Sequence, residues 1–439
     1  MNNIPKRFPA RLSDYLVDYI SESCDMMIQM ELQFDQSLNV ERLAQAIDLA
    51  LDAEPVLGCR LVKVHRKLHW ERLGKGKRPA FLLANDEQEY EQFKSSQIDA
   101  YTGPQIKVCL WRSPDGDRLL IKVAHQIADI GGVKELTAIL SDIYRRLADD
   151  PNYHPEPNVK GSRSLSQAIR HLPWYAYPFV SVSFWWTEFP TYRHRSVQTL
   201  PCADGPREPR TYIYRFILSD RVSTIVDYGH MHNATINDIF VTASLRALAN
   251  MGNWDRRSRL SLETTIDLRR HIPSQHGGAV TNLSAMVYGW PNLSTDPCQN
   301  FVTALDRIAS MTRHGKAHWI GLELLAYPAI LYLLCRNIPA GLGLRFYQKL
   351  INLGYYEHIP EHCFSNAGPI KPESVNFDMQ PTMARILPPT FYPPIPLLFS
   401  LTGYNGTLTL SAGVYPTQKD IAEKFFDAIL KELQSCGGC

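Results

Sequence analysis

The sequence contains no uninterrupted apolar stretch of the length that crosses a membrane. A transmembrane helix needs about 18 or more apolar residues in a row. The best candidate among the 439 residues, the stretch 319–335, is interrupted by Glu323 and Pro328. We expect a buried or kinked helix there, with a segment that inserts into a membrane surface as the alternative. A shorter stretch, 173–186, is rich in Trp, Tyr and Phe, whose rings occur at membrane interfaces, in apolar channels and in ordinary cores.

The cysteines do not form a disulfide framework, and neither sign of charge dominates. Nine cysteines, an odd number, lie mostly singly along the chain, which indicates reduced, intracellular chemistry. The 46 Lys and Arg residues nearly balance the 44 Asp and Glu residues, for a net charge of +2, so no strong field attracts nucleic acid. Asp14 and Asp18 precede any apolar run long enough for a signal peptide. We therefore expect a cytoplasmic protein, with peripheral membrane contact left open.

The first half of the sequence combines strand and helix periods. Alternating apolar residues predict strands at 26–34 and through 119–123. Each strand is followed by a helical pattern, the first between Asn39 and Pro55 and the second over 133–147.

The second half repeats this mixture. A strand is predicted from Thr211 and a helix over 237–250. An Asn-Gly pair at 405–406 lies between two alternating runs and predicts a tight hairpin. The last helix is predicted to begin at Thr417, with Asp420 completing a capping box.

A region rich in Pro, Tyr, Trp and Ser separates the two halves. Such a composition is typical of a connecting segment with irregular ends. We therefore predict an α+β protein, because strands and helices occur in both halves. The predicted divisions are an N-terminal half over 1–160, a connecting aromatic-rich region over 161–210 and a C-terminal half over 211–439.

The sharpest local feature is a His-x-x-x-Asp pattern formed by His125 and Asp129 at the end of a predicted strand. A histidine there can project into a cleft, and with an unperturbed pKa of about 6.5 it can take a proton from an alcohol or amine at neutral pH. Asp129 could fix the ring or anchor the loop by pairing with a distant arginine. Gly131 and Gly132 would let a substrate or a second chain segment approach closely. The pattern alone is weak, because a histidine at a strand end is more often structural.

Support comes from a resemblance to a known superfamily. The stretch VAHQIADIGG at 123–132 resembles the signature of the superfamily that includes chloramphenicol acetyltransferase, plant acyltransferases of the BAHD type, alcohol acetyltransferases and nonribosomal peptide condensation domains. Five further segments resemble the family's segments in the family's order, so the resemblance covers nearly the whole chain. These segments are PVLGCRLV at 55–62, ATINDIFVTASLRAL at 234–248, TTIDLRRHIP at 264–273, GGAVTNLSAMVYG at 277–289 and FSNAGPI at 364–370.

The resemblance implies two chloramphenicol acetyltransferase-like halves that form a pseudo-dimer. A tunnel between them would be reached from opposite faces by the acyl donor and the acceptor. His125 would be the catalytic general base, and Asp129 would point away from the substrate and pair with an arginine. Arg269 is the first choice for that arginine and Arg60 the second. The substrate channel would include Gly131, Gly132 and Asn366.

Three departures from the family pattern narrow the expected function. Condensation domains usually carry a second histidine just before the catalytic one, where this sequence has Ala124. Ile130 stands where a glycine is expected after the aspartate, and the DFGWG element of the plant enzymes is missing. We therefore expect a stand-alone acyltransferase of the alcohol acetyltransferase or polyketide-associated type, acting in natural product or lipid biosynthesis. The alternatives are a catalytically silent condensation-like binding module and an amide-forming nonribosomal peptide condensation enzyme.

The expected partners follow from this function. An acyl-coenzyme A or acyl carrier protein thioester would arrive as co-substrate, and a small, hydrophobic molecule would be the acceptor. We expect no permanently bound cofactor, no nucleic acid and a monomeric chain. No metal is expected, because Pro360 interrupts the helical spacing of His358 and His362. The pair Cys436 and Cys439 is predicted to be a frayed tail.

Overall fold

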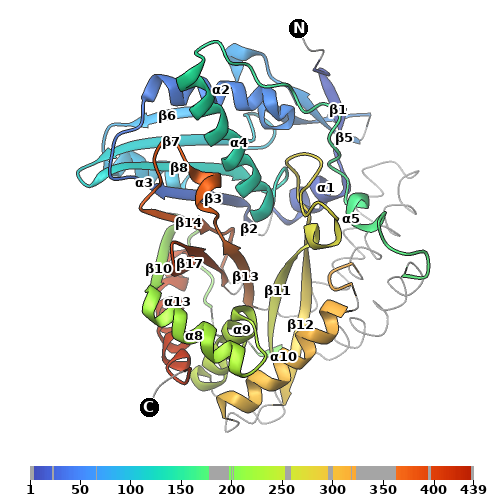
Figure 1. Ribbon diagram of the computed structural model, residues 1–439, viewed down its shortest axis with the longest axis vertical. Coiled ribbons are helices and arrows are strands. Elements are labelled where there is room, and N and C mark those ends of the chain that lie inside the picture. Colours follow the sequence, from blue (N-terminus) through green and yellow to red (C-terminus); the bar gives the residue numbers. More distant parts are fainter. Residues whose placement is uncertain are drawn as a thin grey trace.

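The computed structural model shows two lobes, each built on its own main β-sheet (Figure 1). The first lobe contains the segments drawn in blue and cyan, and the second lobe contains most of those drawn in green, yellow and red. The structure describes residues 4–21, 24–65, 67–176, 197–198, 200, 202–252, 259–294, 300–317, 319–322, 362–393 and 397–436.

The first sheet has five strands in the order β14-β3-β8-β7-β6. Its strands are β3 (Met27–Gln33), β6 (Phe81–Ala84), β7 (Ile106–Ser113), β8 (Gly116–Ala124) and β14 (Met383–Leu387). Helices α2 (Val40–Ala53) and α4 (Ile130–Asp149) pack on this sheet and share one hydrophobic core with it. The alternation in β3 explains the arrangement, because Ile28, Met30 and Leu32 all point into that core.

The second sheet has the order β10-β17-β16-β13-β11-β12, with β9 paired to β11. Its strands are β9 (Val197–Gln198), β10 (Thr211–Ile217), β11 (Arg259–Asp267), β12 (Ser284–Ser294), β13 (His362–Pro369), β16 (Leu398–Tyr404) and β17 (Thr407–Val414). The helices of this lobe are α8 (Ser219–Met231), α9 (Ile236–Met251), α10 (Phe301–Ala317) and α13 (Pro416–Leu433). Residues of all four helices and of the sheet join in a second hydrophobic core.

Local sequence signals explain most of these boundaries. The Asn39 side chain accepts a hydrogen bond from the backbone of Arg42 at the start of α2, as predicted. The predicted hairpin at 405–406 is also confirmed, since both turn residues have positive φ and join β16 to β17. The predicted start of the last helix is wrong by one residue. Helix α13 begins at Pro416, whose fixed φ suits the first helical position and whose nitrogen has no hydrogen to cap.

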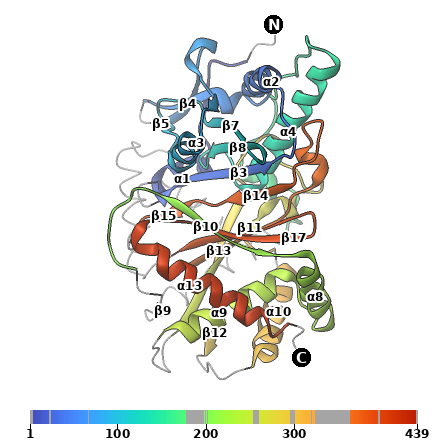
Figure 2. The same cartoon turned by 90° about the vertical axis from the view of Figure 1, so that its left-hand side faces the viewer.

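Strand β14 crosses from the C-terminal half of the sequence into the first lobe. It pairs antiparallel with β3, from Met383 opposite Gln33 to Leu387 opposite Gln29. In Figure 2, β14 lies between β3 and strands of the second sheet. One strand of the predicted range 211–439 thus completes the sheet of the first lobe. An open edge of β3 would leave a row of unpaired backbone groups, which β14 satisfies.

Smaller elements complete the described part of the chain. They are β1 (Arg7–Pro9), α1 (Leu12–Ile20), β2 (Cys24–Asp25), η1 (Pro55–Gly58), β4 (Cys59–Val64), β5 (Lys67–Arg72), η2 (Lys75–Lys77), α3 (Glu87–Ser95), α5 (Ser166–Ile169), η3 (Leu268–His271), η5 (Pro372–Val375) and β15 (Thr390–Phe391). Of the apolar stretches 173–186 and 319–335, the structure describes only 173–176 and 319–322. Among the helices that it describes, none has the length and apolar character needed to cross a bilayer.

Candidate active site

His125 directly follows the last residue of β8, where the strand holds its backbone in place. Its backbone N–H donates to the carbonyl of Met26 at 2.9 Å, and the neighbouring Ala124 N–H donates to Gln105 at 3.0 Å. His125 as a whole residue is half-buried. The strand end thus fixes its backbone, as the sequence predicts, and the role of its ring as a base stays a prediction.

The hydrogen bonds of the ring fix the tautomer of His125. Its Nδ1 lies 2.8 Å from the carbonyl oxygen of Ala128. Because a carbonyl only accepts, Nδ1 must carry the proton, and Nε2 keeps a free lone pair. Burial lowers the pKa of His125 below its usual 6.5, while the charge of Asp129 and the Ala128 carbonyl act in the opposite direction. The ring is therefore neutral, with Nε2 as a base, at neutral pH.

Asn282 is a neighbour of His125 that sequence reasoning missed. Its Nδ2 lies 3.4 Å from the His125 carbonyl oxygen, to which it donates, and 3.3 Å from Nδ1. The amide orientation is fixed because its Oδ1 accepts from both the backbone and the hydroxyl of Ser284. The segment 277–289 carried the family resemblance, but no feature of the sequence separates Asn282 from its neighbours there.

Asp129 anchors the loop that follows the histidine. Its Oδ1 accepts from the Gly132 N–H at 2.7 Å, which makes it the N-cap of α4. Its Oδ2 accepts from the Leu283 N–H at 2.8 Å, in the segment that leads into β12 of the second lobe. The Asp129 carboxylate is buried. Because it bonds to Gly132 in the first lobe and to Leu283 beside the second sheet, it links the two lobes.

Arg269, in η3, is the arginine that pairs with Asp129. Its Nη1 lies 2.9 Å from each carboxylate oxygen, and both side chains are about 5% exposed. Its other nitrogens donate to Glu135 and to the Thr281 carbonyl, at 2.9 and 3.0 Å. The second choice, Arg60, instead forms an exposed pair with Glu71. The structure thus brings the first-choice arginine to the motif and places Arg60 elsewhere.

Gly131 and Gly132 give this arginine room. A Cβ atom on Gly131 would lie 2.4 Å from Nη1 of Arg269, and one on Gly132 would lie 2.8 Å from the Thr281 carbonyl oxygen. The two residues form the first turn of α4. A second chain segment lies beside each glycine, which is one of the two possibilities that the sequence left open, and their place in the channel wall stays a prediction.

Asn366 lies in β13, half-buried, where its Nδ2 is 3.4 Å from Asn237 Oδ1. Just beyond it, Lys134 from α4 donates to the carbonyls of Ala367 and Pro369, at 2.5 and 2.8 Å. Burial lowers the pKa of Lys134 to about 8. The helix that begins at the motif is thus fastened to the second sheet close to Asn366. The role of Asn366 in a channel stays a prediction.

Glu54, in the first lobe, also bonds to the segment 277–283, which Asp129 contacts at Leu283. Its carboxylate accepts from Asn158 Nδ2 at 2.7 Å and from the Val280 N–H at 3.3 Å. Burial raises the pKa of Glu54 to about 7, although both hydrogen bonds and the charge of Arg163 oppose this shift. A carboxyl group that titrates near neutral pH therefore lies in the contact between the two lobes.

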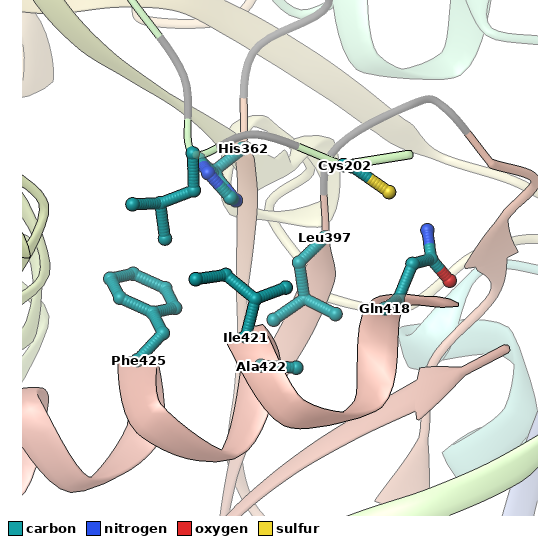
Figure 3. Close-up of a pocket in the computed structure, with 8 residues that line it drawn as sticks. Cys202, His362, Leu397, Gln418, Ile421, Ala422 and Phe425 are labelled. Carbon is teal, nitrogen blue, oxygen red and sulfur yellow. The ribbon is translucent and has the colours of Figure 1, made fainter. Parts of the chain in front are cut away.

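The remaining sequence predictions concern metals and the tail. The described residues contain no group of three His, Cys, Asp or Glu side chains placed to hold a metal ion. His358 and Cys439 lie outside the described residues, whereas His362 lies in β13 and not on a helix. The frayed tail is wrong for Cys436, which is fully buried in the second core because α13 carries it there. The tunnel between the halves stays a prediction. A small pocket among the described residues lies within the second lobe (Figure 3).

The comparisons with known proteins give a fold and no close relative. No family model matches the sequence, and no curated protein matches it. Polyketide synthase associated protein 5 from Mycobacterium tuberculosis is 14% identical, with a TM-score of 0.65 and 98% of each chain covered. A trichothecene 15-O-acetyltransferase from Fusarium sporotrichioides is 11% identical, with a TM-score of 0.69 over 98% of this chain and 95% of that one.

A condensation domain gives the same result. The first condensation domain of the calcium-dependent antibiotic synthetase is 12% identical, with a TM-score of 0.70 over 99% of this chain and 97% of that one. The chain therefore has the two-lobed α+β fold of these three proteins, as the sequence resemblance implies.

Proposed function

We propose, on the premise of this shared fold, that the protein is an acyltransferase. It moves an acyl group from a coenzyme A or carrier-protein thioester to a hydroxyl or amine, with His125 as the general base. The observation that carries the proposal is the 2.8 Å contact between His125 Nδ1 and the Ala128 carbonyl, because it leaves Nε2 free to accept a proton. The names of the structural neighbours, which include an acetyltransferase and condensation domains, support the reaction class.

The proposed reaction balances with the histidine as the proton carrier. The acceptor's hydroxyl or amine donates its proton to Nε2 as its heteroatom attacks the thioester carbonyl. The tetrahedral intermediate collapses, the carbon–sulfur bond breaks, and the leaving thiolate takes the proton back from Nε2. The neutral imidazole is regenerated, and the products are an ester or amide and a free thiol.

Asp129 and Arg269 act in this proposal as positioning residues. The carboxylate bonds to Arg269 and to two backbone N–H groups, and no hydrogen bond between Asp129 and the His125 ring is found. The Asp129 side chain therefore holds the Gly132 and Leu283 backbone, and the Ala128 carbonyl, one residue before Asp129, holds the ring. Loss of the ion pair between Asp129 and Arg269 would let the loop 126–129 move, and the His125 ring would then lose its fixed orientation.

The two alternatives make different predictions. An amide-forming condensation enzyme would turn over only with an amine on a carrier protein, and its usual second histidine is replaced here by the buried Ala124. A catalytically silent module would bind a thioester without releasing its thiol. Thiol release with a hydroxyl acceptor therefore separates the proposed function from both.

The test is thiol release from a panel of acyl-coenzyme A and acyl carrier protein thioesters, with products identified by mass spectrometry. We expect turnover with a small hydrophobic alcohol or amine, and a loss of roughly 100-fold or more in His125→Ala. His230→Ala, at an exposed position on α8, is the matched control and should keep full activity. Equal turnover of the wild type and a folded His125→Ala variant would refute the role of the base.

A further inference from the structure

A second buried ion pair lies beside the loop that follows His125. Arg163, between α4 and α5, donates from Nη2 to Oδ1 of Asp14 at 3.0 Å and from Nη1 to Oδ2 at 3.2 Å. The Arg163 and Asp14 side chains are 9% and 0% exposed. Asp14 belongs to α1, and its Oδ2 also accepts from Trp70 Nε1 at 2.7 Å. A bidentate pair with such a further bond has one fixed geometry.

Arg163 also donates to two backbone carbonyls near the candidate base. Its Nε donates to the Val280 carbonyl at 3.2 Å, and its Nη2 reaches the Ile127 carbonyl, in the loop 126–129, at 3.5 Å. The Arg163 carbonyl in turn accepts from Thr281 Oγ1 at 3.1 Å. One arginine thus bonds to α1, to the loop after the candidate base and to the segment that leads into β12.

Adjacent carbonyls of the segment 280–283 accept from two different arginines. Arg163 binds the carbonyl of Val280 and Arg269 binds that of Thr281, at 3.2 and 3.0 Å. Each arginine also forms a buried ion pair with an aspartate of the first lobe. Two ion pairs therefore hold this segment, directly before the residue whose amide contacts the candidate base.

These contacts bear on the orientation of the His125 ring. The Ala128 carbonyl holds the ring at 2.8 Å, and Asn282 Nδ2 donates to the His125 carbonyl at 3.4 Å. Arg163 bonds to the residue that precedes each of these two partners in the sequence. A displacement of Arg163 would therefore reach His125 by two routes, through the loop and through the segment 280–283.

We propose that Arg163 is a second positioning residue of the candidate active site and that, together with Asp14, it fixes the orientation of the His125 ring. This inference rests on the proposed function, in which that ring is the general base. Arg163 acts through backbone carbonyls and not on the substrate. Its loss should therefore impair the chemical step and leave substrate binding unchanged.

The test compares Arg163→Lys with Arg385→Lys in the full chain. Lysine keeps the positive charge beside Asp14 but cannot make all the contacts of the guanidinium at once. Arg385 is the matched control, because its ion pair with Glu31 has the same exposed fractions, 9% and 0%, and includes no residue of the candidate site. Both variants should lose stability to a similar extent, so a difference between them at His125 reports positioning.

The first measurement needs no substrate. Burial lowers the pKa of His125, with the charge of Asp129 acting in the opposite direction, so a ring released to water should titrate nearer to about 6.5. NMR of the histidine rings follows this titration, and the His125 signal is the one absent in His125→Ala. We expect the pKa of His125 to rise in Arg163→Lys and to stay unchanged in Arg385→Lys. No rise in Arg163→Lys, or an equal rise in both variants, would overturn the proposal.

The second measurement is steady-state kinetics with the thioester and acceptor found in the thiol-release assay. We expect Arg163→Lys to lower kcat by up to about 100-fold, the cost of a misplacement of about 1 Å, with KM unchanged. A higher KM with the wild-type kcat would contradict the proposal, because it would mean that Arg163 serves substrate binding.

Failure of this inference can be told from failure of the proposed function. If the wild type turns over no thioester, the proposed function is refuted, and the ring titration alone decides the role of Arg163. If Arg163→Lys does not fold, Trp70→Phe takes its place, because it removes only the bond from Trp70 Nε1 to Asp14. We expect a smaller rise in the pKa of His125 there, and an unchanged pKa would overturn the proposal.

Discussion

Arg269 Nη1 lies 2.9 Å from both carboxylate oxygens of Asp129, although the two residues are 140 positions apart in the sequence. Asp129 caps α4 in the first lobe, and Arg269 lies in η3 after strand β11 of the second sheet. A single ion pair therefore fixes the loop of the candidate base and joins the two lobes. Its effects on stability and on activity are coupled for this reason.

Removal of the carboxylate should destabilise the protein. Asp129→Ala leaves the buried Arg269 cation without its main partner, for which we expect a loss of about 3 kcal/mol in the free energy of unfolding, measured in urea. Glu135 still bonds to Arg269, which keeps the loss at the lower end of the range for broken buried pairs. Arg60→Ala breaks an exposed pair and should cost less than about 1 kcal/mol. Equal midpoints for the two variants would contradict the structural role of the pair.

Gly131→Ala should reverse the usual effect of this substitution in a helix. Alanine normally stabilises a helix relative to glycine by about 1 kcal/mol. At this position the added Cβ would lie 2.4 Å from Arg269 Nη1, so the guanidinium must move, and we expect a destabilisation of about 1–3 kcal/mol. Gly315→Ala in α10 is the matched control, since the described atom nearest to its Cβ is Cδ1, the flexible end of the Ile320 side chain, at 3.0 Å. Thermal unfolding compares the two variants, and a stabilised Gly131→Ala would show that Arg269 does not need the space.

The pH dependence of activity should report the environment of His125. Burial lowers the pKa of His125, so the free base persists below the usual 6.5 and activity is lost only as the pH falls through this lowered value. We expect the acidic limb of kcat/KM to fall below pH 6.5, because that ratio reports groups of the free enzyme. An acidic limb at or above 6.5 in the wild type would mean that the ring is not desolvated.

Glu54 should make stability depend on pH in the opposite sense from a salt-bridged carboxylate. Its folded-state pKa is raised from 4.5 to about 7, so the folded protein holds the proton more tightly than the unfolded chain. Stability is therefore highest below pH 4.5 with respect to this group and declines up to about pH 7, by about 3 kcal/mol. Glu54→Gln should be more stable than the wild type at pH 8 and not at pH 4.5. Identical pH slopes in urea unfolding would contradict this.

Sequence patterns of a few neighbouring residues predicted the secondary structure around the candidate site. The strand before His125, the helix after it and the 405–406 turn all follow from periodicity or turn chemistry. The pairing of Arg269 with Asp129 came from the family resemblance, because spacing alone cannot choose between two arginines so distant from the motif.

Features made by long-range packing could not be predicted in this way. The contact of Asn282 with His125 joins two lobes, and nothing local to Asn282 indicates it. Glu54 accepts a hydrogen bond from the Val280 N–H, which is 226 positions away in the sequence, and burial of this contact region raises its pKa. The buried Cys436 likewise owes its place to the packing of α13 on the second sheet.

Strand β14 also determines when the first lobe can be finished during synthesis. The other four strands of that sheet end by Ala124, but the edge of β3 is completed only by residues 383–387. A nascent chain therefore carries an open, apolar strand edge while some 260 further residues emerge, about 13–50 s at the usual rate of translation. We expect this edge to be the place where a chaperone or a second nascent chain first engages the protein.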